Sequence, residues 1–159
     1  MRLGLLCIGR LKAGPERELF ERYAKRISAF RNLGLDGLHV RELSESRARA
    51  TSMRKSEESA ALLATLAGDA GFAVFDERGK AATSRDFAQF ILRERDAGRS
   101  ALWFAIGGAE GLDASVVERA GAAFSFGAMT LPHQIVRILA AEQIYRAMTL
   151  ASGHPYHRE

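Results

Sequence analysis

The feature that most constrains the fold is the stretch ALWFAIGG at residues 101–108, which is apolar at every position up to a Gly-Gly turn. Strands that are apolar on both faces belong to parallel sheets covered by helices on each side. The stretch RLGLLCIG at residues 2–9 and the start of GFAVFDERGK at residues 71–80 have the same character. These three stretches predict a buried parallel sheet.

Amphipathic helical patterns alternate with these strands. In residues 15–30, PERELFERYAKRISAF, a proline stands in the first turn and the apolar side chains fall on one stripe. Further helical patterns cover 56–67, 84–97, 109–123 and 134–152, and weaker strands are expected within 33–43 and 124–129. Strands alternating with helices predict an open, mainly parallel α/β sheet with helices on both faces. The 159 residues, 47% of them hydrophobic, are enough for a single domain spanning 1–159.

Composition excludes several classes of protein. No stretch approaches the roughly 18 consecutive apolar residues of a membrane span, and the start MRLGLLCIGR lacks the cleavage site of a signal peptide. We therefore expect a cytoplasmic protein without a membrane partner. Cys7, the single cysteine, lies within an apolar run and is expected to be a buried structural thiol without chemistry of its own.

The charge balance favours a polyanionic partner. Lysine and arginine total 23 against 19 acidic residues, a formal charge of +4. We call residues 45–55, ESRARATSMRK, the basic connector; its cations are Arg47, Arg49, Arg54 and Lys55. This segment is a candidate mobile loop or RNA contact, although a solvated surface is the commoner meaning of such a run.

Ligands of open parallel sheets bind beyond the carboxyl ends of the strands, so the loops after strands carry the functional prediction. Gly107, Gly108 and Gly111 follow one buried strand in IGGAEG, and Asp113 suits the N-cap of the next helix. The spacing matches neither the Rossmann G-x-G-x-x-G nor the Walker pattern, which argues against dinucleotide or nucleoside triphosphate binding. Taken alone, the Gly-Gly turn fits a tight turn as well as a ligand loop.

Two more loops follow strands. FGAMTLPH carries Gly127, Thr130, Pro132 and His133. Pro132 restricts the residue before it to an extended backbone and so directs the loop. In VFDERGK, Asp76 suits the first position of a turn better than the acid of a site.

The closing helical pattern is apolar on several sides. Its apolar members are Ile135, Ile138, Leu139, Ala141, Ile144, Tyr145 and Met148. Apolar residues on several faces indicate burial on more than one side, which in a small chain predicts a twofold homodimer. Glu142 and Arg146 are four residues apart and are expected to form an ordinary surface ion pair.

Three motifs carry a resemblance. IGGAEG, TLPHQIVRILAAEQIYRA and the terminal HPYHRE, in this order and at these distances from the end, resemble the RlmH family of SPOUT-class ribosomal RNA methyltransferases. That family methylates N3 of a pseudouridine in the 23S RNA of the large ribosomal subunit. The resemblance covers the whole chain, and it implies a C-terminal trefoil knot, a homodimer, and S-adenosylmethionine (S-adenosyl-L-methionine) held in the knot.

The resemblance also implies which residues contact the cofactor. These positions are Phe75, Gly107, Phe126, Gly127, Ala128, Met129, Thr130 and Leu131. They fall on the same three loops that follow the predicted strands. A neutral adenosyl group can be held by backbone N–H and C=O groups between apolar side chains, without dedicated charges.

The chain ends in HPYHRE, and its side chains suit the chemistry that the resemblance implies. His154 or His157 has the pKa range of a general base near neutral pH, Arg158 suits stabilisation of an anionic imide, and Tyr156 suits stacking on an RNA base. The choice between the two histidines is open. In the alternative interpretation the tail docks structurally and the proton leaves to water.

Two other functions compete with this one. A zinc site would need three converging ligands, for which His133, His154 and His157 are the candidates, and we expect no metal. A non-enzymatic ribosome-binding or assembly factor also fits the basic charge. For an enzyme of this size we expect recognition of the assembled ribosome by shape and phosphate contacts, from Arg2, Arg10, Lys12 and the basic connector.

Overall fold

The core of the molecule is a five-stranded sheet with the order β2-β1-β4-β3-β5. The computed structural model describes residues 1–66 and 68–156. Its strands are β1 (Arg2–Ile8), β2 (Leu38–Leu43), β3 (Gly71–Ala81), β4 (Ala101–Ile106) and β5 (Ala122–Ser125). All four neighbouring pairs are parallel, so the predicted parallel α/β sheet is confirmed.

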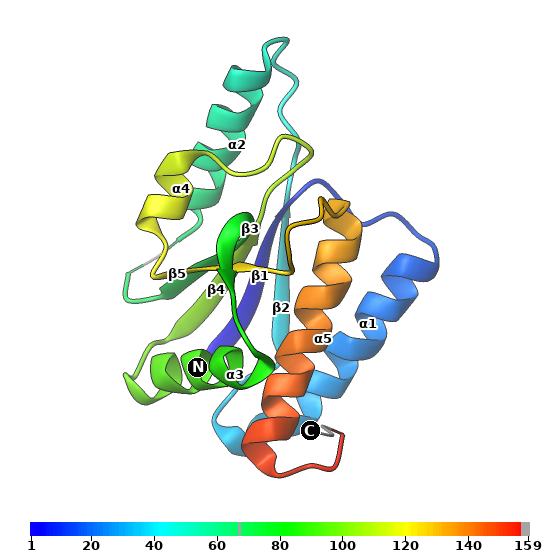
Figure 1. Ribbon diagram of the computed structural model, residues 1–159, viewed down its shortest axis with the longest axis vertical. Coiled ribbons are helices and arrows are strands. Elements are labelled where there is room, and N and C mark those ends of the chain that lie inside the picture. The colour runs from blue at the N-terminus through cyan, green and yellow to red at the C-terminus, as the bar shows by residue number, and fades with distance from the viewer. Residues whose placement is uncertain (67, 157–159) are drawn as a thin grey trace.

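Helices cover both faces of the sheet, as predicted (Figure 1). They are α1 (Pro15–Ile27), the 3-10 helix η1 (Ser28–Leu33), α2 (Thr51–Ala64), α3 (Ser84–Asp96), α4 (Ala114–Arg119) and α5 (His133–Ser152). One face packs against α1, α3 and α5, and the other against α2 and α4. Among the described helices, none has both the length and the apolar character needed to cross a bilayer.

The two faces of the sheet are filled differently. Between the sheet and α3 lies an aromatic cluster, with Phe87 and Phe90 from the helix and Phe75, Phe104 and Phe124 from the strands. On the opposite face Trp103 of β4 lies over Gly4 of β1, its register partner. A Cβ atom on Gly4 would stand 2.1 Å from the Trp103 ring, so the glycine makes the room that the indole fills.

A buried arginine fixes the end of the first strand. Arg137 of α5 is 1% exposed, and its Nη2 donates to the backbone oxygens of Ile8 at 2.6 Å and Gly9 at 2.8 Å. Its Nη1 forms an ion pair with Glu42 of β2 at 3.0 Å, and Glu42 also accepts from the Leu11 backbone N–H. This one guanidinium therefore joins α5 to the carboxyl ends of β1 and β2.

Several predicted boundaries differ from the observed ones, among them that of the helix expected at 109–123, which covers only Ala114–Arg119. The first helix ends at Ile27 and continues as η1, in which Phe30 has non-helical backbone angles. The helix α2 begins at Thr51, so the second half of the basic connector is helical and not a loop. The strand β5 covers 122–125 instead of the expected 124–129, because the Ser125 hydroxyl bonds both backbone groups of Gly127 and turns the chain out of the sheet.

The apolar faces of α5 are mostly covered within the subunit. Ile144 and Met148 are fully buried in the cluster that α5 shares with α1 and α3, while Ile135 remains 37% exposed. The breadth of the apolar surface is thus explained by helices on two sides of α5 and does not by itself require a second subunit. The homodimer remains a prediction. Glu142 and Arg146 form the expected ion pair, but with side chains 15% and 29% exposed it is partly buried and not an ordinary surface pair.

Candidate functional site

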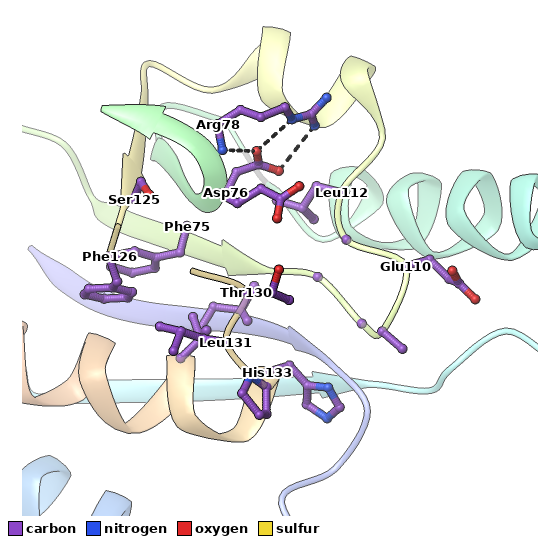
Figure 2. A pocket seen from close by; sticks show the side chains of 18 of the residues that line it. Phe75, Asp76, Arg78, Glu110, Leu112, Ser125, Phe126, Thr130, Leu131 and His133 are labelled. Atoms are coloured by element: carbon purple, nitrogen blue, oxygen red, sulfur yellow. Dashed lines mark hydrogen bonds and ion pairs between the residues drawn. The ribbon is translucent and has the colours of Figure 1, made fainter. Parts of the chain in front are cut away.

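A cavity of about 710 Å³ opens at the carboxyl edge of the sheet, where the bulge within β3 meets the loops after β4 and β5. Its walls comprise residues 75–78, 106–112, 124–127, 129–134 and 136, with Lys55 from α2 (Figure 2). These segments include the three loops that the sequence singled out. The parallel sheet brings them together because parallel strands end at the same edge.

The loop after β4 is built from glycines for steric reasons. A Cβ on Gly107 would stand 2.7 Å from the backbone carbon of Gly111, closer than real Cβ contacts come. Gly108 and Gly111 form an isolated antiparallel bridge, and Gly111 has a φ of 72°. Asp113 then caps α4 by accepting from the Ser115 backbone N–H, as predicted. This glycine loop therefore offers bare backbone to a ligand.

The loop from β5 to α5 forms a second wall. Gly127 has a φ of 124°, and Met129 is 82% exposed at the cavity mouth. Leu131 and Pro132 lead into α5, whose first residue, His133, also lines the cavity. In Figure 2, Thr130, Leu131 and His133 lie along the wall contributed by this segment.

An aromatic pair lies at the inner end of the cavity. The rings of Phe75 and Phe126 stack with centroids 4.9 Å apart and an interplanar angle of 12°. Phe75 also stacks on Phe104 of the core, at 5.6 Å. Figure 2 shows the Phe75 and Phe126 rings side by side. The cavity thus offers a flat apolar surface next to the bare glycine backbone.

Beyond Phe75, β3 leaves the sheet and then returns over β5. Both Phe75 and Lys80 pair with Phe124, and the intervening residues bulge outward. A Cβ on Gly79 would stand 2.7 Å from the carbonyl carbon of Phe124, so β3 crosses β5 at the closest approach that a glycine allows. Figure 1 shows the far end of β3 crossing in front of β5.

The bulge in β3 presents Asp76 to the cavity. Burial opposes ionisation of this carboxylate, but hydrogen bonds from the backbone and side chain of Arg78 outweigh it, and the pKa of Asp76 is lowered. The turn that the sequence favoured at Asp76 is not observed, because residues 71–81 form one bulged strand, and the Asp76 side chain is a cavity wall with only 6% exposure. Burial, followed by the charge of Arg137, lowers the pKa of His133. The histidine therefore faces the cavity as a neutral ring near pH 7.

Comparison with known proteins identifies the family. The family model described as a predicted SPOUT methyltransferase matches residues 1–157. The chain belongs to the SPOUT methyltransferase family. A relative named Ribosomal RNA large subunit methyltransferase H, from Methylocella silvestris, is 52% identical over 160 residues that cover all of both chains. Its namesake from Rhizobium leguminosarum is 52% identical over 159 residues, covering 99% of each chain.

Solved structures support the same fold. A probable methyltransferase from Bordetella pertussis has a TM-score of 0.53 at 15% identity, covering 92% of this chain and 93% of its own. A structure titled for 2-OH methylation of C/U34 on tRNA has a TM-score of 0.50 at 19% identity, covering 93% and 91%. At these identities the two structures bear on the fold alone.

The residues predicted to bind the cofactor of this SPOUT methyltransferase gather at one site, with one exception. Seven of them line the cavity: Phe75, Gly107, Phe126, Gly127, Met129, Thr130 and Leu131. Ala128 is exposed and is not among the lining residues. Their contacts with a cofactor remain predictions.

The predicted catalytic tail lies far from this cavity in the same subunit. Helix α5 starts at the cavity and has 20 residues, so its far end is about 30 Å away. There His154 is exposed, and the Tyr156 ring packs on Tyr145 with centroids 4.7 Å apart. Burial, followed by a hydrogen bond with Tyr23, raises the pKa of Tyr156 to about 12. His157 and Arg158, the other two predicted residues, lie outside the described part of the chain.

Several cavity residues were not singled out as site residues from the sequence. Lys55 reaches the cavity from α2, and Glu110, Leu112 and Ser125 line it from the loops. Glu110 lies within the motif IGGAEG, and Ser125 comes directly before FGAMTLPH. The motifs therefore located the loops of the site but did not identify every residue that lines the cavity. Within residues 1–66 and 68–156, no group of three or more His, Cys, Asp and Glu side chains is arranged to hold a metal ion.

Proposed function

We propose that this SPOUT methyltransferase transfers a methyl group from S-adenosylmethionine to N3 of a pseudouridine in 23S ribosomal RNA. The observation that carries the proposal is the 52% identity, over the full length, to relatives named Ribosomal RNA large subunit methyltransferase H. The cavity adds physical support, because its walls come from the loops where open parallel sheets bind ligands. Specificity for N3 of pseudouridine rests on the family resemblance of the sequence motifs.

The cavity walls suit an adenosyl cofactor. Gly107 and Gly127 offer backbone hydrogen bonds without side chains in the way, and the stacked rings of Phe75 and Phe126 offer an apolar surface. A methyl group on a sulfonium is already activated, so the protein has mainly to align donor and acceptor and help N3 lose its proton. Close crossing of β3 over β5 at Gly79 is consistent with the trefoil knot, which remains part of the proposal.

The tail supplies the groups suited to proton transfer, and the geometry favours its action on a second subunit. The cavity and His154 lie at opposite ends of α5, about 30 Å apart. His157 and Arg158 come one and two residues after Tyr156, too close to it along the chain to span that distance within one subunit. In a twofold dimer each tail would complete the cavity of the other subunit, with His154 or His157 as base and Arg158 stabilising the anionic imide. Exposed Ile135 beside the cavity is a candidate dimer contact.

The sequence suggested that Tyr156 stacks on an RNA base, and its contacts within the subunit give it a narrower role. With a pKa raised to about 12, its hydroxyl stays protonated near neutral pH and is not a general base. Its oxygen lies 3.4 Å from the Glu142 carboxylate and its ring packs beside Arg146. Tyr156 therefore anchors the start of the tail, which agrees with the docking alternative for this residue while leaving the histidines available.

Single-turnover methyl transfer to ribosomes tests the proposal. Removal of the true base by His154→Ala or His157→Ala should slow transfer by about 10²–10⁴-fold without weakening cofactor binding. Naked 23S RNA should be a poorer substrate than ribosomes if recognition uses the assembled shape. Wild-type rates in both histidine variants would refute the base assignment. Failure of the wild-type protein to bind S-adenosylmethionine would favour a non-enzymatic ribosome-binding factor.

A further inference from the structure

Residues 45–50, the part of the basic connector that precedes α2, present two exposed arginines. Arg47 and Arg49 are exposed, and within the described part of the chain neither side chain has a hydrogen-bond or ion-pair partner. Cations held at a surface without an acidic partner suit contact with RNA phosphates. The mechanism described above gives this segment no role in the cofactor site.

Arg54, in the first turn of α2, holds this segment and the cofactor cavity together. Its Nη1 donates to the backbone oxygens of Ala48 at 3.2 Å and Arg49 at 3.0 Å. Its Nη2 forms an ion pair with Glu110, a cavity-lining residue of the glycine loop. The Arg54 and Glu110 side chains are 28% and 31% exposed, so solvent screens this pair only partly. One planar guanidinium thus spans the two segments.

A second side chain on α2, that of Glu58, also lies between residues 45–50 and the glycine loop. Glu58 is 7% exposed, and its Oε1 accepts from the Ser46 backbone N–H at 2.9 Å. Its Oε2 is buried without a hydrogen-bond partner in the described structure and points at Gly108, whose Cβ position would lie 3.1 Å away. Glu58 therefore lies between the Ser46 backbone and the glycine loop, beside the connection that Arg54 makes.

We propose that Arg54 is a positioning residue that couples RNA contact at residues 45–50 to cofactor binding at the glycine loop. The inference rests on the proposed function. When RNA phosphates bind Arg47 and Arg49, they also fix the backbone oxygens of residues 48 and 49, to which Arg54 donates. The Arg54 guanidinium is then held in place, and with it the orientation of Glu110. Linkage makes the effect reciprocal, so RNA tightens cofactor binding by the same factor as the cofactor tightens RNA binding.

Equilibrium dialysis of labelled S-adenosylhomocysteine, with and without ribosomes lacking the modification, measures this coupling. We expect ribosomes to lower the Kd of the wild-type protein by about fivefold or more. Arg54→Ala should reduce the ratio of the two Kd values to about one. Arg54→Lys should not restore it, because a single ammonium cannot hold two carbonyls and a carboxylate in a fork. Glu110→Gln removes the ion pair from the other end and should also lower the ratio.

Arg95→Ala is the matched control. Arg95 is 27% exposed, donates to the Leu33 backbone oxygen at 3.0 Å and pairs with Asp96, but it stands at the C-terminal end of α3, away from the cavity. It should leave the coupling at the wild-type value. Full coupling in Arg54→Lys, or none in the wild-type protein, would overturn the inference. Methyl transfer to the same ribosomes is measured in a separate assay. If the wild-type protein shows coupling but no methyl transfer, that result refutes the proposed function and leaves the coupling established.

Discussion

Replacement of Arg137 by methionine should destabilise the protein more than loss of any surface ion pair. The substitution keeps an unbranched apolar stem but removes the guanidinium from a site that is 1% exposed. The backbone oxygens of Ile8 and Gly9 lose their Arg137 donor, and Glu42 loses its cation. The Leu11 N–H remains with Glu42, so part of the site stays satisfied.

The size of the effect follows from these contacts. Removing one partner from a buried charged pair costs about 3–5 kcal/mol, because the groups left behind are desolvated without compensation. The Arg137 Nε is itself buried without a partner, which lowers the loss towards the bottom of that range. For a chain of 159 residues, about 2–4 °C per kcal/mol gives a fall in Tm of roughly 6–20 °C.

Urea unfolding followed by circular dichroism, at one fixed protein concentration, provides the assay. The midpoint should fall with an unchanged slope, which reports a change in stability alone. Arg17→Met is the control, since Arg17 pairs with Glu21 where both side chains are more than half exposed, and it should leave the urea midpoint nearly unchanged. A loss below 1 kcal/mol for Arg137→Met, or equal losses in both variants, would refute the reasoning.

Three further predictions follow from particular contacts. Gly4→Ala would place a Cβ 2.1 Å from the Trp103 ring, so the free energy of unfolding should fall by about 1–3 kcal/mol in urea titration. Trp103→Leu removes the ring that this Cβ would meet, so Gly4→Ala should cost less stability in the Trp103→Leu background. Gly107→Ala would bring a Cβ within 2.7 Å of the glycine-loop backbone and so displace this loop, and calorimetry should show S-adenosylmethionine binding at least about tenfold weaker; unchanged binding would contradict the cavity assignment. The pKa of His133 is lowered in the folded state, so protonation opposes folding, and wild-type stability should fall relative to His133→Gln as the pH drops below about 6.5; parallel pH profiles would contradict this.

Much of the architecture could be predicted because local patterns reported it directly. The six residues of β4 are all buried, and their continuous apolar run is the pattern that predicted the buried parallel sheet. A general rule of such sheets then placed the loops at the strand ends, and seven of the cofactor residues that the family resemblance implied line the cavity there. Boundaries were less predictable, since β5 ends at Ser125 through side-chain bonds to Gly127 that no periodicity reveals.

Long-range contacts of polar residues could not be predicted from the sequence. Arg137 looks like one more cation in a helix, yet it is buried against residues about 130 positions earlier in the chain. Arg54 and Glu110 are 56 residues apart, and only the packing of α2 beside the glycine loop brings them together. The tail shows a related limit, because its motif indicated chemistry while the length of α5 separates it from its own cavity.

The most direct test of the account is transfer of labelled methyl from S-adenosylmethionine to ribosomes that lack the modification, followed by mass spectrometry of the digested RNA. A parallel substrate carries uridine at the target position in place of pseudouridine. The account predicts one methyl group on N3 of a single pseudouridine in the large subunit, with weaker transfer to uridine. Cofactor binding without any transfer to 23S RNA would contradict it.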